Sequence, residues 1–455
     1  MIPSARDIAV WALSDRAGNI SASLDRLLGH GGLSSQDKAL AHELALGACR
    51  RRGTLRAVAR AFLAQPDHRL PGALNEIIDI ALYQLLFLSR VPDFAAVNEA
   101  VDQAARYHHR RQSGLVNGLL RTVARNISPM MTGNPPLSAE VLPISPQGYR
   151  TFSKAVFTDP QIAPADYLSE AFSLPQVLAK RWLEQMGGLE QAVALATHAN
   201  TTPPLIVRAN ALKSDPGKVV GLLRAEGIQA SLHANGVSVV MDHYNIRELG
   251  VFRAGLIQPQ DPTATAVVLE ADPKPGDRVL DLCAAPGTKT THLAEKMGNK
   301  GSILATDVSA DKLQAIGTNC QRLGINIVQT MTVAKLATVE AGSFDLVIAD
   351  VPCSNTGVLA RRAEARWRFD EYRQAELVKD QHALSASAAT FVKSGGKLVY
   401  STCSIEPEEC RDVTRWLVQR EPRMRLLRDQ LTLPAGAEDP TRWRDGGYVA
   451  LFEAV

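Results

Sequence analysis

A chain of 455 residues is longer than a single hydrophobic core usually supports, so two or three domains are expected. Its hydrophobic fraction of 45% and charged fraction of 21% exclude an intrinsically disordered or fibrous protein. The formal net charge of +3 is too small to indicate a nucleic-acid partner by itself, and the basic cluster at residues 49–53 is typical of a solvated helix face. Six cysteines without a Cys-x-x-Cys pair predict neither a disulfide framework nor a metal site.

No segment has the pattern of a signal peptide or a membrane span. The apolar run near the N-terminus is bracketed by Asp7 and Asp15 and is too short for a signal peptide. The most apolar segment, residues 77–91, is interrupted by Asp79 and Gln84 and is shorter than a bilayer requires. We therefore expect a cytoplasmic protein that does not associate with membranes.

The N-terminal part of the chain has the periodicity of α-helices. Ile78 and Leu82 lie four residues apart in one such stretch, and the segments 94–107 and 114–126 repeat the same period. This pattern predicts an all-α helical bundle over residues 1–130.

Residues 131–164 are dense in proline, glycine and serine, a composition that regular elements rarely tolerate over such a length, and we predict a linker there. Residues 165–245 show a mixed pattern of helical and strand periodicity. The expected elements are a helix at 175–187, a strand at 204–210, a helix at 216–227 and strands at 230–234 and 236–242. Their order predicts a small α+β module.

From residue 246 to residue 455, short apolar runs alternate with segments long enough for helices. The expected strands are 278–284, 301–308, 327–333, 344–351 and 396–403. This alternation predicts a doubly wound, mostly parallel α/β sheet, in which ligands bind outside the carboxyl ends of the strands. The polar residues at those ends are Asp281, Asp307, Asp350, Cys353 and Cys403, and we expect them to share one edge of the sheet.

The loop after the first of these strands, residues 281–295, contains Gly287 and runs into a helix, so its backbone can approach a ligand closely. It lacks the three-glycine pyrophosphate fingerprint, which argues against a dinucleotide. Asp307 ends the next strand, where an acidic residue can bind both hydroxyls of a ribose. Taken singly, the loop could be an ordinary strand-to-helix turn, and Asp307 could be a helix cap with Ser309. Taken together, the loop and Asp307 favour a nucleoside cofactor without a diphosphate, and S-adenosylmethionine is the commonest such cofactor.

Two of the cysteines lie at strand ends. A thiolate is a soft nucleophile suited to adding at C6 of a pyrimidine, which makes C5 able to attack an electrophilic methyl group. A second thiol can assist release of the product, and the Asp350 carboxyl can hold cytosine N3. The residues leave open whether Cys353 or Cys403 is the nucleophile. The remaining cysteines Cys49, Cys320 and Cys410 are interpreted as buried apolar residues.

Three motifs, LDLCAAPGTKTTHLAE, IADVPCSNTGVL and YSTCSIEPEE, together resemble the RNA cytosine-5 methyltransferases. Upstream, ALYQLLFLSRVPDFAAVNEAVD and GLVNGLLR resemble the NusB-like domain that is fused to such an enzyme in the bacterial Sun/Fmu family. The resemblance extends from about Ile8 to Phe452. It implies a NusB-like RNA-binding domain, an RNA-binding α+β module and a Rossmann-like domain that uses S-adenosylmethionine to form 5-methylcytosine in 16S ribosomal RNA.

The resemblance also implies roles for individual residues. Cys403 is the nucleophile and Cys353 assists product release, the reverse of the order in DNA cytosine methyltransferases. Lys289 lies near the reacting base, and Asp350 is shared between the cofactor and the base. The implied cofactor-binding residues are Cys283, Ala284, Ala285, Pro286, Gly287, Thr288, Lys289, Asp307 and Asp350.

Three positions depart from the family pattern. Thr288 stands where the family usually has glycine, and it restricts the cofactor loop. Ala334 stands near the end of the third strand, where an aspartate usually bonds the adenine amino group. Residues 361–365 read Arg-Arg-Ala-Glu-Ala in place of Arg-Arg-His-Pro-Asp. The first two bear on cofactor affinity and the third on RNA contacts.

Arg208 and Asn210, in the strand of the α+β module, are candidate RNA contacts, although a solvent-facing strand edge explains them nearly as well. The expected partner is RNA, with 16S ribosomal RNA favoured, and the expected state is a monomer. Two rival functions stay open: methylation of transfer RNA or another RNA, and an RNA-binding assembly factor whose methyltransferase domain has decayed.

Overall fold

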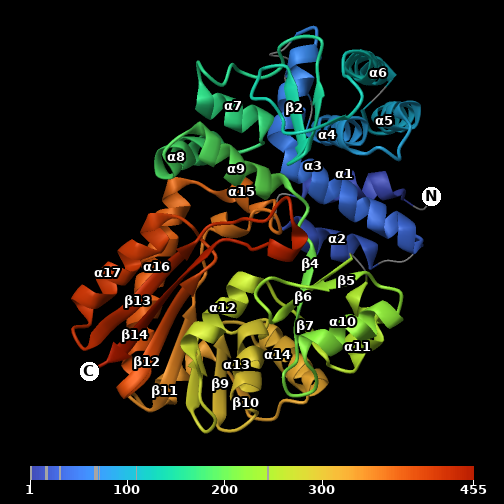
Figure 1. Ribbon diagram of the computed structural model, residues 1–455. Coiled ribbons are helices and arrows are strands. Elements are labelled where there is room, and N and C mark those ends of the chain that lie inside the picture. Colours follow the sequence, from blue (N-terminus) through green and yellow to red (C-terminus); the bar gives the residue numbers. More distant parts are fainter. Residues whose placement is uncertain are drawn as a thin grey trace. The chain divides into compact units, whose positions relative to one another are not determined.

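The computed structural model describes residues 3–15, 19–29, 32–65, 70, 72–108, 110–242 and 245–455. The chain forms two compact units (Figure 1). The first contains Met1–Thr201 and Leu359–Phe369, and the second contains Thr202–Val358 and Asp370–Val455. A late segment of the chain therefore completes the unit that begins at the N-terminus.

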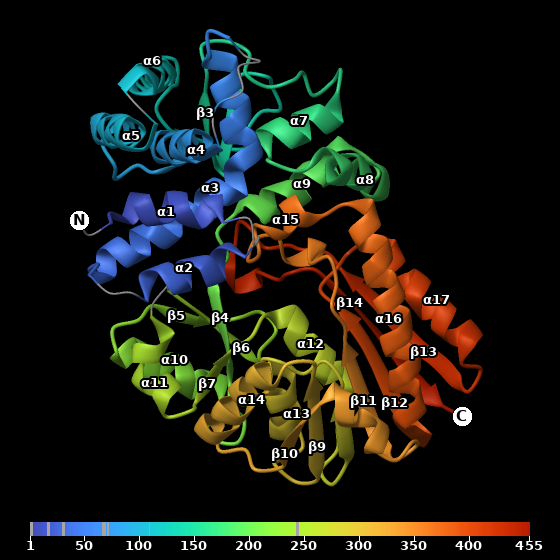
Figure 2. The same ribbon diagram turned by 180° about the vertical axis from the view of Figure 1, so that it is seen from behind.

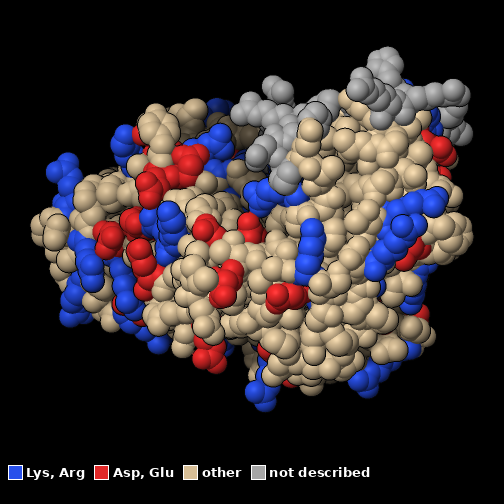
Figure 3. Space-filling view, turned by 90° about the horizontal axis from the view of Figure 1, so that it is seen from above, with Lys and Arg blue, Asp and Glu red and all other residues tan. Residues whose placement is uncertain are grey.

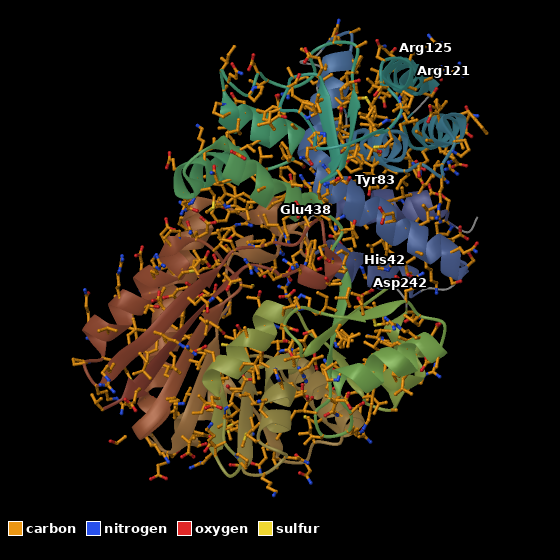
Figure 4. All side chains as sticks on the ribbon, viewed as in Figure 1. His42, Tyr83, Arg121, Arg125, Asp242 and Glu438 are labelled. Atoms are coloured by element: carbon orange, nitrogen blue, oxygen red, sulfur yellow. The ribbon has the colours of Figure 1, made fainter. Side chains whose placement is uncertain are left out.

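The predicted helical bundle is confirmed in the first unit. Its helices are α1 (Ala5–Ser14), α2 (Ile20–Leu28), α3 (Ser35–Phe62), α4 (Gly72–Phe87), α5 (Asp93–His108) and α6 (Arg110–Arg125). The helix starts follow from local sequence: Ser4 and Asp7 form a capping box on α1, and Ser34 caps α3. Tyr83 on α4 donates a hydrogen bond of 2.6 Å to Glu43 on α3 and links the two helices (Figure 4).

The basic cluster on α3 is not a solvated face, which corrects the sequence-based interpretation. Arg50 and Arg51 are both buried. Arg51 donates to the carbonyl oxygens of Pro143 and Ile144 at 3.1 and 2.8 Å, and burial lowers its pKa to about 9. The Arg51 guanidinium is buried because it donates to these backbone oxygens, and a local sequence pattern does not reveal such distant acceptors.

The predicted linker at 131–164 is also wrong over residues 131–151. Three short strands lie there, β1 (Met131–Thr132), β2 (Val141–Ser145) and β3 (Gly148–Thr151), and they form an antiparallel sheet in the order β1-β3-β2. Pro143 lies inside β2, which is an edge strand, and an edge tolerates a residue without an N–H donor. The proline-rich composition therefore concealed a sheet.

Three further helices, α7 (Pro164–Ala171), α8 (Gln176–Met186) and α9 (Leu189–Asn200), group with the helical unit and not with the α+β module expected over 165–245. The short helix α15 (Ala365–Arg368) lies beside α9 (Figures 1 and 2). Arg366 on α15 is fully buried and donates to the carbonyl oxygens of Arg50, Ser173 and Ala199 at 2.7–3.1 Å. The altered segment 361–365 directly precedes the buried Arg366, and three of its five residues are themselves buried.

The second unit begins with a four-stranded antiparallel sheet. It contains β4 (Leu205–Ala209), α10 (Pro216–Ala225), β5 (Ala230–Leu232), β6 (Ser238–Met241), the 3-10 turn η1 (Ile246–Glu248), α11 (Gly250–Arg253) and β7 (Ile257–Pro259). The strand order β5-β6-β4-β7 and the βαββαβ succession are those of a ferredoxin-like fold. β7 pairs with β4, so this sheet extends beyond the predicted boundary at residue 245.

The large sheet has seven strands in the order β10-β9-β8-β11-β12-β14-β13. Its strands are β8 (Arg278–Asp281), β9 (Ser302–Asp307), β10 (Val328–Thr332), β11 (Phe344–Asp350), β12 (Val392–Thr402), β13 (Met424–Thr432) and β14 (Gly447–Ala454). The first five are parallel, as expected; β14 runs antiparallel to β12 and to β13. The order reverses between β8 and β11, where a doubly wound sheet binds its ligand.

Helices cover both faces of this sheet (Figures 1 and 2). One face carries α12 (Pro262–Ala271), α13 (Thr288–Lys296) and α14 (Ala310–Leu323); the other carries α16 (Glu371–Phe391) and α17 (Arg411–Arg420). Successive side chains alternate between the two cores: Val347 packs on the α16 side, and Leu346 and Ile348 pack on the α13 side. The short turns η2 (Val333–Thr338), η3 (Thr356–Val358), η4 (Pro407–Glu409) and η5 (Pro440–Arg442) complete the unit.

The surface carries charges of both signs. On the face shown in Figure 3, basic and acidic side chains are interspersed, in keeping with the small net charge. Arg121 and Arg125 are exposed one turn apart on α6 (Figure 4). Within the described part of the chain, no helix is long and apolar enough to cross a membrane.

Candidate active site

The loop between β8 and α13 owes its shape to Gly287. This residue has φ of +93°, and a Cβ on it would lie 3.0 Å from Ile316, so only glycine is comfortable there. Thr288 is the first residue of α13 and needs no special backbone conformation. The expected restriction of the loop by Thr288 is therefore not observed, because its neighbour carries the positive φ.

Asp307 ends β9 beside this loop. Its carboxylate accepts hydrogen bonds from the backbone N–H groups of Ala285 and Ser309 at 3.3 and 3.4 Å, and Lys312 lies 3.9 Å away. Both interpretations of Asp307 thus find support, because it restrains the loop and also presents a carboxylate at the carboxyl end of the strand. Cys283 in the loop is half-buried, and burial raises the pKa of its thiol to about 12.

Asp281, at the end of β8, is fully buried. One carboxyl oxygen accepts a hydrogen bond of 2.7 Å from Thr290, and the other has no hydrogen-bond partner among the described residues. Burial raises the pKa of Asp281 to about 7. The second oxygen is therefore an acceptor that a ligand could use. From the sequence, Asp281 was placed at a strand end but was assigned no role.

Lys289 and Asp350 form an ion pair of 2.6 Å between α13 and the end of β11. The second oxygen of Asp350 accepts a hydrogen bond of 2.8 Å from Ser401 on β12. Burial alone would lower the pKa of Lys289, but the attraction and hydrogen bond of Asp350 outweigh it and leave the pKa raised. Lys289 consequently stays an ammonium group beside the predicted base site.

Cys353 and Cys403 come together as expected from their strand ends. Their Sγ atoms lie 3.0 Å apart. The hydrogen bond with Cys403 and burial together hold the pKa of the Cys353 thiol well above its usual value. Cys353 is therefore kept as a thiol, while the less buried Cys403 also points an Sγ at Asn355 Oδ1, at 3.4 Å.

The fully buried Glu409 on η4 braces both cysteine loops. Its carboxylate accepts hydrogen bonds from the backbone N–H and hydroxyl of Ser354, next to Cys353, and from the hydroxyl of Ser404, next to Cys403. The amide of Gln381 on α16 donates a further bond of 3.0 Å. Sequence reasoning missed this residue, although a glutamate six positions after a predicted catalytic cysteine was a visible signal.

The two cysteine loops also touch through their backbones. Gly357 donates its N–H to the carbonyl oxygen of Cys403 at 3.0 Å, and its own carbonyl accepts the N–H of Gly446 at 2.7 Å. A Cβ on Gly357 would lie 2.6–2.8 Å from these two neighbours, so a side chain would force the segments apart. The position of Cys403 is thus fixed from two sides.

A pocket opens at the carboxyl end of the sheet with a volume of about 120 Å³. Lys289, Asp350 and Cys403 line it, together with residues of α12 and the start of β14. Cys353 is not among the described residues that line it. Of the two thiols, Cys403 therefore faces the pocket.

Arg208 and Asn210 are not RNA contacts in this structure, which corrects the prediction. Both are buried, and Arg208 pairs with Glu295 on α13 through two hydrogen bonds of 2.6 and 3.0 Å. Asn210 donates to the carbonyl oxygens of Gly255 and Leu323 at 2.9 and 3.0 Å. Both residues join the ferredoxin-like part to the large-sheet part of the same unit.

Ala334 lies in η2, after the end of β10, and is exposed. Its methyl group cannot supply the hydrogen bond that an aspartate would make there. The departure noted in the sequence is therefore also a departure in the structure.

Comparison with known proteins identifies the family. The chain is 30% identical over 428 residues to a probable ribosomal RNA small subunit methyltransferase B of Bacillus subtilis, covering 92% of this chain and 89% of the relative. It is 32% identical over 415 residues to a protein of the same description from Synechocystis, covering 89% and 87%. Three family models match: NusB family over residues 3–125, the RsmF/B-like ferredoxin-like domain over 174–242, and 16S rRNA methyltransferase RsmB/F over 266–442.

The chain belongs to the RsmB/F family of 16S rRNA methyltransferases. The Sun/Fmu resemblance and the three-part fold expected from the sequence are thereby confirmed. Among solved structures, that of PH0851 has a TM-score of 0.74 at 23% identity and covers 99% of this chain and 98% of its own. A methyltransferase homologue from Pyrococcus horikoshii has a TM-score of 0.53 at 26% identity and covers 66% of this chain and all of its own.

As a member of the RsmB/F family, the protein is a methyltransferase that uses S-adenosylmethionine. The site residues fit this cofactor. Asp307 presents a carboxylate at the carboxyl end of β9, and Asp281 has a buried oxygen without a donor among the described residues. When bound, the cofactor supplies an electrophilic methyl group.

Proposed function

We propose that this enzyme methylates C5 of a cytosine in 16S ribosomal RNA through a covalent bond between Cys403 and C6. The observation that carries the proposal is the pair of thiols 3.0 Å apart, of which only Cys403 lines the pocket that also holds Lys289 and Asp350. A single nucleophile would need one thiol. Two thiols at the ends of adjacent strands suit a reaction in which a covalent intermediate is both made and released.

The chemistry begins at the Cys403 thiolate. As Sγ bonds to C6, the C5–C6 π electrons move into a C4–C5 double bond, and the π electrons of the C4=N3 double bond move to N3, which takes a proton from solvent. C5 is then the nucleophilic carbon of an enamine and accepts the methyl group, and the thioether S-adenosylhomocysteine is left as the second product. Loss of the C5 proton to water restores the C5–C6 double bond, expels Sγ as a thiolate and returns the N3 proton.

Three side chains support these steps in the proposal. Asp350 accepts the N3–H bond of the adduct, and the Lys289 ammonium, 2.6 Å from Asp350, favours electron density on the base. Cys353, kept as a thiol by its raised pKa, donates an S–H hydrogen bond to the departing Cys403 sulfur. In the proposal, Cys353 therefore assists release of the product from Cys403 and does not attack C6.

The substrate base has to leave its stack to reach this pocket, as in other enzymes that modify nucleobases. We infer that the NusB-like and ferredoxin-like parts bind the surrounding ribosomal RNA, a role that rests on the family alone. The expected setting is the cytoplasm.

The proposal is tested by incubating the purified protein with radiolabelled S-adenosylmethionine and either 16S ribosomal RNA or total transfer RNA. Digestion to nucleosides should place the label in 5-methylcytidine from the ribosomal RNA. Label in another nucleoside would overturn the C5 chemistry, and label only in transfer RNA would overturn the substrate. A protein that binds RNA but transfers no label would favour the assembly-factor hypothesis.

A further inference from the structure

A second hollow of about 440 Å³ adjoins the pocket of Cys403 within the second unit. Thr263, Ala266, Gln430 and Thr432 line both, so the two spaces are neighbours. The hollow is also lined by the β5–β6 turn, at residues 233–235, and by two arginines that precede β14. Nothing in the proposed chemistry uses it.

Arg442 is the last residue of the turn η5, and Arg444 follows two residues later in a bridge with Ala435. Both are exposed, whereas the neighbouring Trp443 and Asp445 are buried, and the Trp443 indole N–H donates to Asp445 at 3.1 Å. Both arginines are among the residues that line the hollow. Both guanidinium groups are therefore presented to the hollow.

This segment is held in place by the ferredoxin-like part. His233 Nε2 hydrogen-bonds the carbonyl oxygen of Trp443 at 2.8 Å, and the N–H of Ala234 donates to the carbonyl oxygen of Thr441 at 2.8 Å. The other ring nitrogen of His233 accepts the N–H of Asn235 at 3.1 Å. The arginines thus stand on a braced backbone, which lowers the entropic cost of holding a ligand.

The charge of the hollow is positive. No aspartate or glutamate is among the described residues that line it, and the loop's exposed Glu438 (Figure 4) is outside that lining. Arg442 has one acidic neighbour, Asp439, at 3.6 Å, but both side chains are well exposed and such a pair is weak. Arg444 uses its Nε for the carbonyl oxygen of Leu433, and among the described residues its Nη groups have no hydrogen-bond acceptor.

We propose that this hollow with Arg442 and Arg444, called the arginine groove below, binds backbone phosphates of the single-stranded RNA segment that flanks the target cytosine. The inference rests on the proposed function and adds a subsite to it. A base inserted beside Cys403 stays attached to its ribose and phosphates, and the hollow with the two arginines adjoins the Cys403 pocket at Thr263 and Thr432. Guanidinium groups bind phosphate oxygens in a bidentate manner, without reading sequence.

The test compares Arg442→Ala/Arg444→Ala with a matched control, Arg415→Ala/Arg420→Ala. The control removes the same charge from exposed positions on α17, and Arg415 pairs with Asp412 three residues away as Arg442 pairs with Asp439. Dissociation constants for an unpaired ribosomal RNA fragment are measured over a range of salt concentrations. Each lost phosphate contact should reduce the slope of log affinity against log salt by about 0.7.

The groove variant should bind more weakly than wild type, with a slope smaller by about 1.4 for two contacts, and the control should match wild type. Arg442→Lys/Arg444→Lys, which keeps the charge, should recover most of the slope. A slope equal to wild type in the alanine variant, or an equal reduction in the control, would overturn the proposal. S-adenosylmethionine binding by each variant shows that the unit is folded, and because RNA binding is measured without turnover, failure of the proposed methylation would not alter this result.

Discussion

Glu409 accepts a hydrogen bond of 2.9 Å from the backbone N–H of Ser354. A residue that follows Cys403 in the chain therefore holds the loop that carries Cys353. The same carboxylate accepts the Ser404 hydroxyl at 2.9 Å. The 3.0 Å separation of the two sulfur atoms is therefore maintained by a third group that touches neither of them. Glu409 is a positioning residue, and its effect should be visible in reaction steps that need both thiols.

Glu409→Gln should reduce methylation strongly while leaving S-adenosylmethionine affinity unchanged. An amide replaces one accepting oxygen with a donor, so at least one of the buried donors now bonded to Glu409 loses its partner, at a cost of about 1–3 kcal/mol. Glu376→Gln, on the exposed face of α16, is the control. Single-turnover rates with RNA and calorimetry with the cofactor separate the two effects, and full activity in Glu409→Gln would contradict the bracing role.

The two cysteine variants should differ in the species they accumulate. Cys403→Ala should abolish methylation and any covalent adduct, because no bond to C6 forms. Cys353→Ala should attack and methylate, then stall as a protein–RNA adduct that survives denaturing electrophoresis and carries the radiolabelled methyl group. Cys320→Ala, a buried thiol on α14, should behave as wild type. An adduct trapped by Cys403→Ala and absent from Cys353→Ala would show that the assignment is inverted.

Asp307→Asn should weaken S-adenosylmethionine binding by roughly ten- to a hundred-fold, the scale of a lost hydrogen bond to a buried polar group. Ala285 and Ser309 donate to different oxygens of Asp307, so the asparagine keeps an accepting oxygen for one of these two N–H groups and retains part of the loop's restraint. Unchanged affinity in calorimetry would remove Asp307 from the cofactor site.

Ala334→Asp should tighten cofactor binding. The position is exposed just after β10, and a carboxylate there restores the acceptor that the family usually offers to the adenine amino group. Ala337→Asp, at another exposed position of the same turn, controls for the added charge. Equal effects of the two substitutions would show that charge and not a specific contact is responsible.

Asp281 should make the stability of the second unit depend on pH. Burial raises its pKa from an unfolded value near 3.8 to about 7, so the folded state holds a proton that the unfolded chain has lost. Its contribution to stability is present below pH 3.8 and is lost as the pH rises through about 7. Asp281→Asn should therefore gain melting temperature relative to wild type between pH 5 and pH 8, while the exposed Asp311→Asn should show no such trend. A constant difference between Asp281→Asn and wild type would contradict the raised pKa.

The sequence predicted the parts of the site that are local. Four parallel strands of the large sheet, β8, β9, β11 and β12, are largely buried and were visible as short apolar runs, whereas β10 is partly exposed and was recognised from its β-branched residues and position. The residues that follow these strands meet at one edge because the strands are parallel. That reasoning placed Cys353 near Cys403, whereas Lys289, which pairs with Asp350, was implied only by the family resemblance. The antiparallel β13 and β14 were not predicted. β13 is largely exposed and has no continuous apolar run, whereas β14 is a mostly buried apolar run that the prediction overlooked.

What failed in the prediction depends on partners distant in the chain. Arg208 looked like a surface residue until Glu295, on a helix of another part of the unit, supplied its counterion. Arg51 is buried because the carbonyl oxygens of a sheet that itself escaped prediction accept its donors. A buried charge needs a compensating group, and local periodicity carries no information about where that group comes from.

Arg366 has a consequence for the order in which the protein can fold during synthesis. N-terminal domains generally fold first as the chain leaves the ribosome. Here the carbonyl oxygens of Arg50, Ser173 and Ala199 accept hydrogen bonds from the guanidinium of Arg366, which is synthesised only after β11 and the Cys353 loop. The helical unit cannot reach its final packing until the ribosome has passed residue 369, so this unit is completed only after Cys353 of the second unit has been synthesised.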